Sequence, residues 1–386
     1  MAAGCAFRHG IAPGSGSGGD AADAPIADAI ADGAAVGCVR SLDGDHYFTC
    51  AARTDGTAWC WGANAEGELG TGGTTDSPTP VRVGTLTGIV AVAVAGRTGY
   101  ALDNTGVVWA WGTNVDGELG DGTTTDSLVP KVVAGVTGIV AIDAGRGHAC
   151  ALGGSGDVSC WGFNSDQQTG DGMTGTNRLA PFLALQGASQ ITAEGRHTCA
   201  RKTDGSLWCW GDNAKGEMGK GTYTGDEPPA VVPSFTAVQV AAGGRHTCAR
   251  ATDDTVWCWG DNRYGQVTGG SAMYAAPVQV AGIDGVTAVY ASGRRSCVRR
   301  TGGAIWCWGE TLYGTPGTAQ PAVGIDAPHE VTELAGATAL AMAAYHVCAV
   351  FPDGTLRCAG RNTNGELGDT TTTSRTTYAA VSLACP

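Results

Sequence analysis

The sequence lacks long apolar runs and has few basic residues. No stretch of about 18 consecutive apolar residues occurs among its 386 residues, so no membrane-spanning helix is expected. Lys and Arg together number 23 against 36 Asp and Glu, which gives a net charge of −13. Because proteins draw most of their affinity for nucleic acids from basic groups on phosphates, nucleic acid is not an expected partner. The acidity favours solubility and repulsion from other acidic surfaces.

Motifs of the common catalytic sites are also absent. There is no G-x-S-x-G nucleophile elbow and no phosphate-binding loop. The stretch HEVTE at 329–333 ends in Glu333, whereas the zinc-protease motif H-E-x-x-H requires a second histidine at that place. We therefore predict no catalytic residue, no metal site and no cofactor.

What the sequence does contain is an internal repeat. The tryptophan of a Trp-Gly pair recurs at Trp61, Trp111, Trp161, Trp210, Trp259 and Trp308, and Ala359-Gly360 takes the seventh position. Seven units of about 50 residues fill residues 37–386, so no length remains for a second domain.

Each unit has the pattern of four β-strands. Segments such as GIVAVAVAG (88–96) alternate apolar and small residues with the period of a strand. A hairpin follows whose turn ends in glycine, or in Asp254 in one unit, which suits the left-handed last residue of a three-residue loop. Short runs such as PVRV (80–83) supply the fourth strand. Since one blade cannot cover its own faces, we predict an all-β, seven-bladed β-propeller with four antiparallel strands per blade.

The loop motifs resemble those of a known family. WGTNVDGELGDGTTTDSLVP (111–130), WGDNAKGEMG (210–219) and RNTNGELGDTTTTS (361–374) are similar to the repeats of the regulator of chromosome condensation family. The resemblance covers about nine tenths of the chain and implies a seven-bladed propeller, in agreement with the spacing. For function it implies nucleotide exchange on a small GTPase, as in the best-known eukaryotic members, or protein binding, as in secreted bacterial members that inhibit enzymes.

Twelve of the 15 cysteines form six pairs ten residues apart. In a three-residue hairpin the two members of such a pair face each other, with Cα atoms about 4.5–5.5 Å apart, which is within the range for a disulfide. We predict the bridges Cys50–Cys60, Cys150–Cys160, Cys199–Cys209, Cys248–Cys258, Cys297–Cys307 and Cys348–Cys358. The alternative is a set of reduced, buried thiols. Zinc is not expected, since each blade offers two thiols where a closed site needs four ligands.

The cysteines outside this pattern support the covalent interpretation. In the second unit Tyr100 and Ala110 replace both members of the pair, so a large and a small residue refill one shared space. Cys38 begins the first unit and Cys385 ends the chain, where the first and last blades must meet. We predict a Cys38–Cys385 disulfide that locks the ring and stabilises it more than the short hairpin bridges do.

The last cysteine, Cys5, points to the location of the protein. The phrase AAGC at 2–5 resembles the cleavage box of bacterial lipoproteins, in which the cysteine is lipidated, although no basic and apolar signal segment precedes it. Residues 1–36 are rich in Gly, Ala, Ser, Asp and Pro and predict a disordered tether before the propeller of residues 37–386. Because disulfides persist in oxidising surroundings, we expect an extracytoplasmic protein, either a cell-envelope lipoprotein or a secreted one. A cytosolic protein is the remaining alternative.

Four further sets of equivalent positions receive structural roles. The histidines should each bond a turn of their own blade, since copies around the ring lie about 10 Å apart, too far for one metal; they are His148, His197, His246 and His346. The arginines would line one mouth of the channel and attract anions; they are Arg97, Arg196, Arg245 and Arg294. The tryptophan pairs, such as Trp59 and Trp61, would form core between blades, and the turn aspartates Asp55, Asp204, Asp253 and Asp353 would shape hairpins.

Loops that vary between units are the expected binding surface. Tyr, Met and Arg are enriched at the centres of protein interfaces, and they gather in the loops of units four to six. The predicted partner-binding residues are Tyr223, Arg263, Tyr264, Tyr274, Leu312 and Tyr313, with Met273 beside them.

Together these features predict a monomeric, disulfide-linked propeller that binds a protein or another ligand outside the cytoplasm without catalysis. One alternative is a propeller-fold polysaccharide lyase or hydrolase, which carboxylates clustered at one mouth of the channel would favour. The other is a guanine-nucleotide exchange factor-like regulator of a small GTPase, which reduced thiols would favour.

Overall fold

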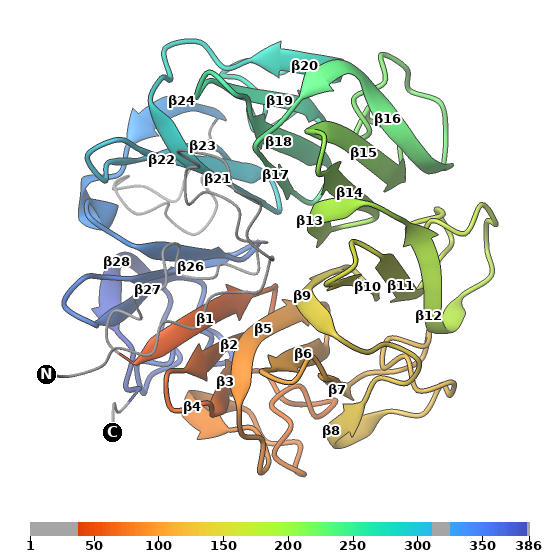
Figure 1. Ribbon diagram of the computed structural model, residues 1–386. Coiled ribbons are helices and arrows are strands. Elements are labelled where there is room, and N and C mark those ends of the chain that lie inside the picture. Colours follow the sequence, from red (N-terminus) through yellow and green to blue (C-terminus); the bar gives the residue numbers. More distant parts are fainter. Residues whose placement is uncertain (1–37, 311–324, 384–386) are drawn as a thin grey trace, which may run out of the picture.

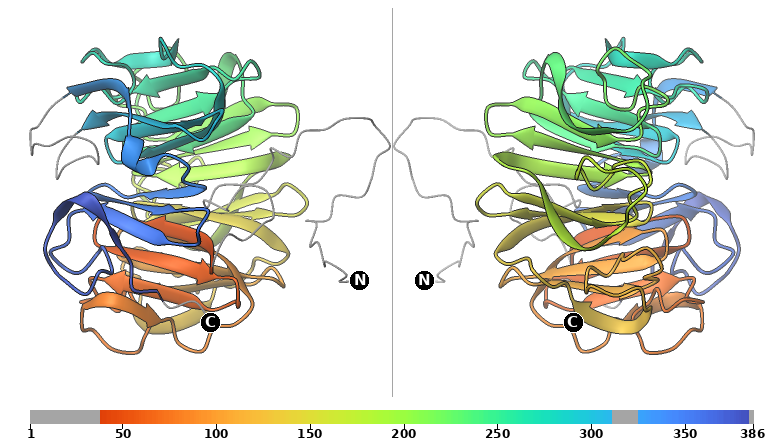
Figure 2. Two further views of the ribbon diagram at one scale, coloured as in Figure 1. Left: turned by 90° about the vertical axis from the view of Figure 1, so that its left-hand side faces the viewer. Right: turned by 90° about the vertical axis from the view of Figure 1, so that its right-hand side faces the viewer.

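Each sequence unit folds into one four-stranded antiparallel sheet, and the seven sheets stand around a central axis (Figure 1). The computed structural model describes residues 38–310 and 325–383. Side views show the sheets stacked as blades around the ring (Figure 2). The predicted all-β, seven-bladed propeller is confirmed. The predicted tether at 1–36 lies outside the described residues.

The strands of every blade follow in chain order, and the first strand of each blade lies innermost. Blade one holds β1 (Val39–Gly44), β2 (Phe48–Arg53), β3 (Ala58–Gly62) and β4 (Ser77–Arg82), and blade two β5 (Ile89–Ala95), β6 (Thr98–Asp103), β7 (Val108–Gly112) and β8 (Ser127–Val132). Blade three holds β9 (Ile139–Gly145), β10 (His148–Gly153), β11 (Val158–Gly162) and β12 (Arg178–Leu185), and blade four β13 (Ala188–Glu194), β14 (His197–Lys202), β15 (Ser206–Gly211) and β16 (Glu227–Thr236). Blade five holds β17 (Gln239–Ala242), β18 (His246–Arg250), β19 (Val256–Gly260) and β20 (Tyr274–Gln279).

Blade six holds β21 (Val286–Ser292), β22 (Arg295–Arg300), β23 (Ile305–Glu310) and β24 (Ile325–Glu330). Blade seven holds β25 (Ala339–Met342), β26 (His346–Val350), β27 (Leu356–Gly360) and β28 (Arg375–Ala380). A short 3₁₀ helix, Thr332–Leu334, joins these two blades. In the described part of the chain no helix has the length and hydropathy of a membrane span.

The ring closes through side chains. All four strands of each described blade come from one continuous stretch of chain, so β1 meets β25 and β26 as a neighbouring blade. His346 Nε2 and Thr49 Oγ1 lie 2.7 Å apart across this junction, and Trp61 Nε1 donates to Glu366 O at 2.8 Å. The histidine contact recurs at three other interfaces and the indole bond at five, so closure repeats the interface used elsewhere.

The second tryptophan of each Trp-x-Trp pair forms the core between blades. Trp111 and Trp161 are completely buried, and their indole N–H groups donate to Glu68 O at 2.7 Å and Glu118 O at 2.8 Å in the preceding blade. The first tryptophan of the pair, such as Trp59, is only half-buried. The expectation that both members form core therefore holds for the second tryptophan only.

The hairpins carry the predicted disulfides. Six bridges are present, Cys50–Cys60, Cys150–Cys160, Cys199–Cys209, Cys248–Cys258, Cys297–Cys307 and Cys348–Cys358, each between directly paired strand positions. Asp254 has φ of +61°, as its turn requires. Cys38 is also disulfide-bonded. Its predicted partner Cys385, like Cys5, lies outside the described residues, so the ring-locking bridge and the lipidation stay predictions.

Blade two replaces its bridge with a hydrogen bond. Tyr100 pairs with Ala110 in the register of the cysteines, and its hydroxyl donates to Glu118 O at 2.9 Å. At four other interfaces a threonine or serine of the next blade donates to the equivalent carbonyl, as Thr198 Oγ1 does to Gln168 O at 3.0 Å. Blade three has Ala149 at that position. Tyr100 therefore fills the space of the missing bridge and also supplies the missing hydroxyl.

Candidate functional site

The two faces of the ring differ in the loops they carry. Ala63 N donates to Tyr47 O at 2.9 Å, which places the loop after the third strand beside the turn between the first two strands. These turns contain Arg97, Arg146 and their equivalents, so we name this side the arginine face. The hairpin face, on the other side, carries the turns between second and third strands. There Asp55 Oδ1 accepts from Thr57 N at 3.0 Å, the hairpin-shaping role predicted for this aspartate.

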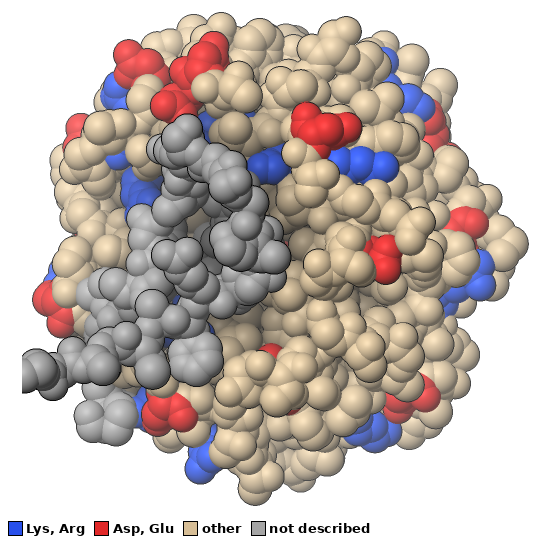
Figure 3. Space-filling model, viewed as in Figure 1, with Lys and Arg blue, Asp and Glu red and all other residues tan. Residues whose placement is uncertain are grey.

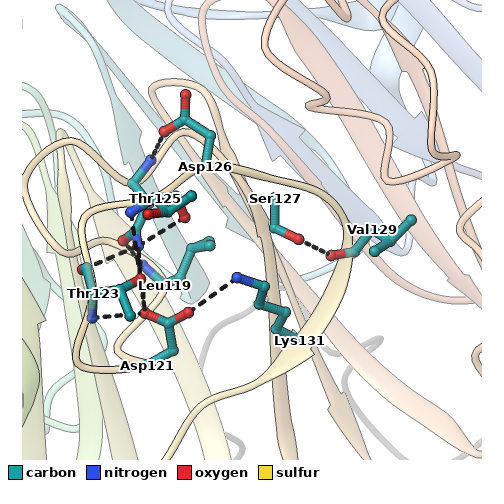
Figure 4. Close-up of polar contacts among 9 residues, drawn as sticks. Leu119, Asp121, Thr123, Thr125, Asp126, Ser127, Val129 and Lys131 are labelled. Carbon is teal, nitrogen blue, oxygen red and sulfur yellow. Dashed lines mark hydrogen bonds and ion pairs between the residues drawn. The ribbon is translucent and has the colours of Figure 1, made fainter.

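A buried asparagine holds six of the long loops of the arginine face. Asn114 Nδ2 donates to Thr123 O and Thr125 O at 3.1 Å, and Asn114 Oδ1 accepts from Leu119 N at 2.8 Å (Figure 4). Asp126 Oδ1 in turn accepts from Asn114 N at 2.7 Å. The equivalent residues Asn64, Asn164, Asn213, Asn262 and Asn362 are all buried. Loops fixed in this way present their outer side chains with little loss of conformational entropy on binding.

Most of the predicted arginine rim is already paired. The guanidinium of Arg97 lies 2.9 Å from Glu66 and that of Arg196 lies 3.2 Å from Asp166, each a carboxylate of the preceding blade. Arg294 pairs with Glu310 at 3.0 Å and stacks over the ring of Tyr264 at 4.1 Å. On the face that Figure 3 shows, basic and acidic side chains likewise alternate around the ring. The rim is therefore a set of oriented ion pairs more than a continuous positive surface.

A cavity of about 300 Å³ opens on the arginine face between blades two and three. Its walls include Asp116, Glu118, Thr113, Arg146 and Phe163, with Arg97 and Arg196 at its sides. Burial, with a smaller contribution from nearby Asp116, raises the pKa of the Glu118 carboxyl to about 7. The sequence analysis did not predict this site. A signal for it exists in the turn GRGH at 145–148, which reverses the Gly-Arg order of GGRH at 243–246.

Carboxylates gather in the central channel. Asp43 Oδ2 accepts from Val94 N at 2.7 Å and Asp143 Oδ2 accepts from Ala193 N at 3.0 Å, so each satisfies a backbone N–H on the first strand of the next blade. Burial raises the pKa of Asp43 to about 7, and that of Glu194 well above its usual range. The cavity between them is about 60 Å³, room for a few water molecules. Asp43 and Asp143 therefore link the first strands of neighbouring blades.

The histidines bond the next blade and not a turn of their own, which corrects the expectation. The hydroxyl of Thr198 donates to Gln168 O, so His148 Nε2 is the donor to Thr198 Oγ1, at 2.9 Å. The equivalent contacts are His197–Thr247 at 2.9 Å, His246–Ser296 at 2.8 Å and His346–Thr49 at 2.7 Å. Burial lowers the pKa of His148 to about 3, so its imidazole is neutral at pH 7. No group of three or more His, Cys, Asp and Glu side chains suited to a metal occurs within residues 38–310 and 325–383.

The predicted partner patch divides into two contacts. Tyr223 is 51% exposed and its hydroxyl donates to Met273 O at 3.1 Å, which joins the loops of blades four and five; Tyr274 follows, half-buried. Tyr264 lies under Arg294 of blade six, and exposed Arg263 pairs with buried Asp261 at 2.7 Å. Leu312 and Tyr313, the other two predicted residues, lie outside the described residues. The partner role of this patch stays a prediction.

Known proteins share this architecture. The human WBSCR16 structure is 20% identical with a TM-score of 0.75, covering 85% of this chain and 94% of that one. Yeast RCC1 (Prp20), solved bound to Kap60, is 19% identical with a TM-score of 0.74, covering 98% and 91%. Prp20p from Saccharomyces cerevisiae, in a study of its binding to Gsp1p and histones, is 19% identical with a TM-score of 0.73, covering 90% and 87%. At these identities the likeness shows the fold.

The sequence itself gives the family. No curated protein matches the chain. A regulator of chromosome condensation (RCC1) repeat matches residues 44–68 and an RCC1-like domain matches residues 57–384. The second match takes in all seven tryptophan-glycine positions or their equivalent, from Trp61 to Ala359. This chain therefore belongs to the RCC1-like domain family.

Proposed function

We propose that this chain is a non-catalytic propeller that binds a protein partner through its arginine face, outside the cytoplasm. One observation carries the proposal: exposed Tyr223, Met273 and Arg263 stand on that face, on or beside loops that buried asparagines hold in place. Residues of these types contribute most of the energy at protein interfaces, and preorganised loops reduce the entropy lost on binding.

Structures of the same fold support protein binding. Prp20p was studied for binding to Gsp1p and histones, and yeast RCC1 was solved bound to Kap60. A propeller of this shape therefore serves as a platform for proteins in other members. At 19% identity their partners are not transferred to this chain, so the exchange-factor alternative rests on the fold alone.

The disulfides support a location outside the cytoplasm. Six bridges in one chain require an oxidising compartment in most organisms. Membrane attachment through Cys5 belongs to the same proposal. A count of free thiols in protein alkylated directly in cells tests it, since reduced cysteines would contradict the location.

The polysaccharide lyase alternative has one observation in its favour, the carboxylates of the channel. Asp43 and Asp143 are occupied by backbone N–H groups, and the space beside them holds only a few water molecules. A sugar chain would need much more room between the catalytic carboxylates. The geometry therefore favours a structural role for these residues and a non-catalytic protein.

The test is partner capture with variants matched across the two faces. Immobilised full-length protein is exposed to an envelope and secreted fraction, and the captured protein is identified and its affinity measured. Tyr223→Ala combined with Arg263→Ala should weaken that affinity by at least about tenfold, since each is of a hot-spot type. Arg357→Ala on the hairpin face, where Arg357 pairs with Asp353, should leave it unchanged. Equal binding by all three proteins would contradict the proposal.

A further inference from the structure

The cavity between blades two and three lies where the repeat loses one side chain. In blades two and four, Arg97 and Arg196 reach back to Glu66 and Asp166 of the preceding blade, at 2.9 and 3.2 Å. The equivalent acid of blade two is Asp116, and the equivalent residue of blade three is Gly147. Both line the cavity, so the place that a guanidinium takes at two neighbouring interfaces holds no side chain of blade three.

The walls of this cavity contain side-chain oxygen atoms that can accept hydrogen bonds. One oxygen of Asp116 accepts from Asn177 Nδ2 at 2.8 Å, which fixes the carboxylate and leaves the second oxygen for another donor. Thr113 Oγ1 is buried and has no hydrogen-bond partner among the described residues. Glu118 is 5% exposed, and burial first, then the carboxylates of Asp116 and Asp126, raise its pKa to about 7. Asp116 and Glu118 therefore present two carboxyl groups to the cavity.

The positive groups around the cavity are of two kinds. Arg97 and Arg196 are already neutralised by Glu66 and Asp166. Arg146 is exposed, and no salt bridge or side-chain hydrogen bond engages it within the described residues. An anion would have to rely on Arg146, whereas a cation would be repelled by it. This single residue distinguishes the two kinds of ligand.

We propose that this cavity binds a guanidinium group, presented by an arginine side chain of the protein partner, with Asp116 as its ion-pair partner and Phe163 beside it. The proposal rests on the proposed function, since it names the chemistry by which the partner is recognised. Its template is internal: in blade four Arg196 pairs with Asp166, the equivalent of Asp116, and lies over the Phe163 ring at 5.9 Å. Blade two has Thr113 at the position of Phe163, so at the proposed site the ring comes from the opposite wall, in blade three. Carboxylate pairing and stacking on a ring are the contacts that a guanidinium makes best.

The test uses four capped tripeptides, Gly-X-Gly with X as arginine, citrulline, lysine or glutamate, titrated into the full-length protein and followed by NMR. We expect the arginine peptide to bind and citrulline, the uncharged isostere, to bind at least about tenfold more weakly, as loss of a charge-assisted hydrogen bond implies. Asp116→Asn should weaken the arginine peptide similarly. Arg146→Ala should leave it unchanged or tighten it.

A turn exchange gives the matched variant. Arg146→Gly with Gly147→Arg converts GRGH at 145–148 into the GGRH found at 243–246, which supplies an internal guanidinium on a turn known to fold in this ring. It should abolish peptide binding. Because Gly147 has φ of +84°, the exchanged turn must take the backbone of the blade-five turn, and an unchanged midpoint of thermal unfolding is the check that it does so.

Three results would overturn the proposal: no binding of the arginine peptide, equal binding of citrulline, or binding of the glutamate peptide that Arg146→Ala removes. The two proposals fail separately. If the arginine peptide binds but the capture variants do not differ, the proposed partner surface is wrong and the guanidinium site is supported. If the capture variants differ but the arginine peptide does not bind, the guanidinium site is wrong and the partner surface is supported.

Discussion

At the scale of single residues, one carbonyl oxygen on each of six loops organises the contact between two blades. Gln168 O accepts from Trp210 Nε1 at 2.9 Å and from Thr198 Oγ1 at 3.0 Å, and His148 donates to that same hydroxyl. All these groups are buried, so each needs its partner, and the cost of losing one depends on how many others it leaves unpaired. Tyr100 performs the hydroxyl's role at the interface between blades two and three.

Removing these hydroxyls should have graded costs. Tyr100→Phe keeps the volume and leaves Glu118 O with its bond from Trp161, so we expect a loss of about 1 kcal/mol in the free energy of unfolding. Thr198→Val leaves His148 Nε2 buried without an acceptor, and we expect a loss of about 2–3 kcal/mol. Urea unfolding at neutral pH measures both. An equal loss for the two variants would show that the histidine contact contributes nothing.

At the scale of the hairpin, blade two is the natural control for the disulfides. Tyr100 and Ala110 occupy the same register as the six bridged pairs. Tyr100→Cys with Ala110→Cys should therefore form a seventh hairpin bridge, visible by mass spectrometry as two fewer alkylated thiols before reduction than after it. We expect the net gain in unfolding free energy to be within about 1 kcal/mol, because a ten-residue loop bridge contributes about 2–3 kcal/mol while the hydroxyl bond and packing of Tyr100 are lost. Two free thiols would contradict the register argument.

The fold and the bridges could be predicted because they depend on spacing within one unit. Alternation gives strands, and a ten-residue separation across a three-residue turn places Cys50 opposite Cys60. The contacts between units could not be predicted in the same way. Nothing in the spacing says that His148 bonds Thr198 of the next blade, or that Gly147 leaves a cavity beside Asp116, because both depend on how neighbouring sheets approach each other.

At the scale of the whole ring, burial protects the bridges. Every described hairpin cysteine is at most 3% exposed, so a reductant cannot reach the sulfur atoms while the blades are packed. We expect the native protein to release no thiols in glutathione, and to release them at the rate of unfolding when urea is added. Mass spectrometry of the protein, after alkylation of its thiols and removal of the glutathione, tests this. Rapid release without denaturant would mean that single blades open independently.

The ring also contains two sets of buried groups that titrate in opposite directions. The buried histidines have folded pKa values of about 3 or 4, below the ordinary value near 6.5, so they lower stability as the pH falls through that interval. Buried carboxyls such as Asp43, with a folded pKa of about 7, bind protons more tightly when folded, so they lower stability as the pH rises above about 4. The two effects oppose each other between about pH 4 and 6.5, and only the carboxyls act above it.

Glu217 isolates the carboxyl effect, because the repeat itself supplies the control. Burial and nearby Asp212 raise the pKa of Glu217 to about 8, while the equivalent residues Gln168 and Gln266 accept the same backbone bond without a charge. Glu217→Gln should therefore fold normally and gain stability over the wild type as the pH rises from about 4.5 to 8, by up to about 1.4 kcal/mol per pH unit, with no further gain above pH 8. Urea unfolding of both proteins from pH 5 to 9 measures the difference. If the difference in unfolding free energy does not change with pH, Glu217 has the same proton affinity in the folded and unfolded states, which would contradict the raised pKa.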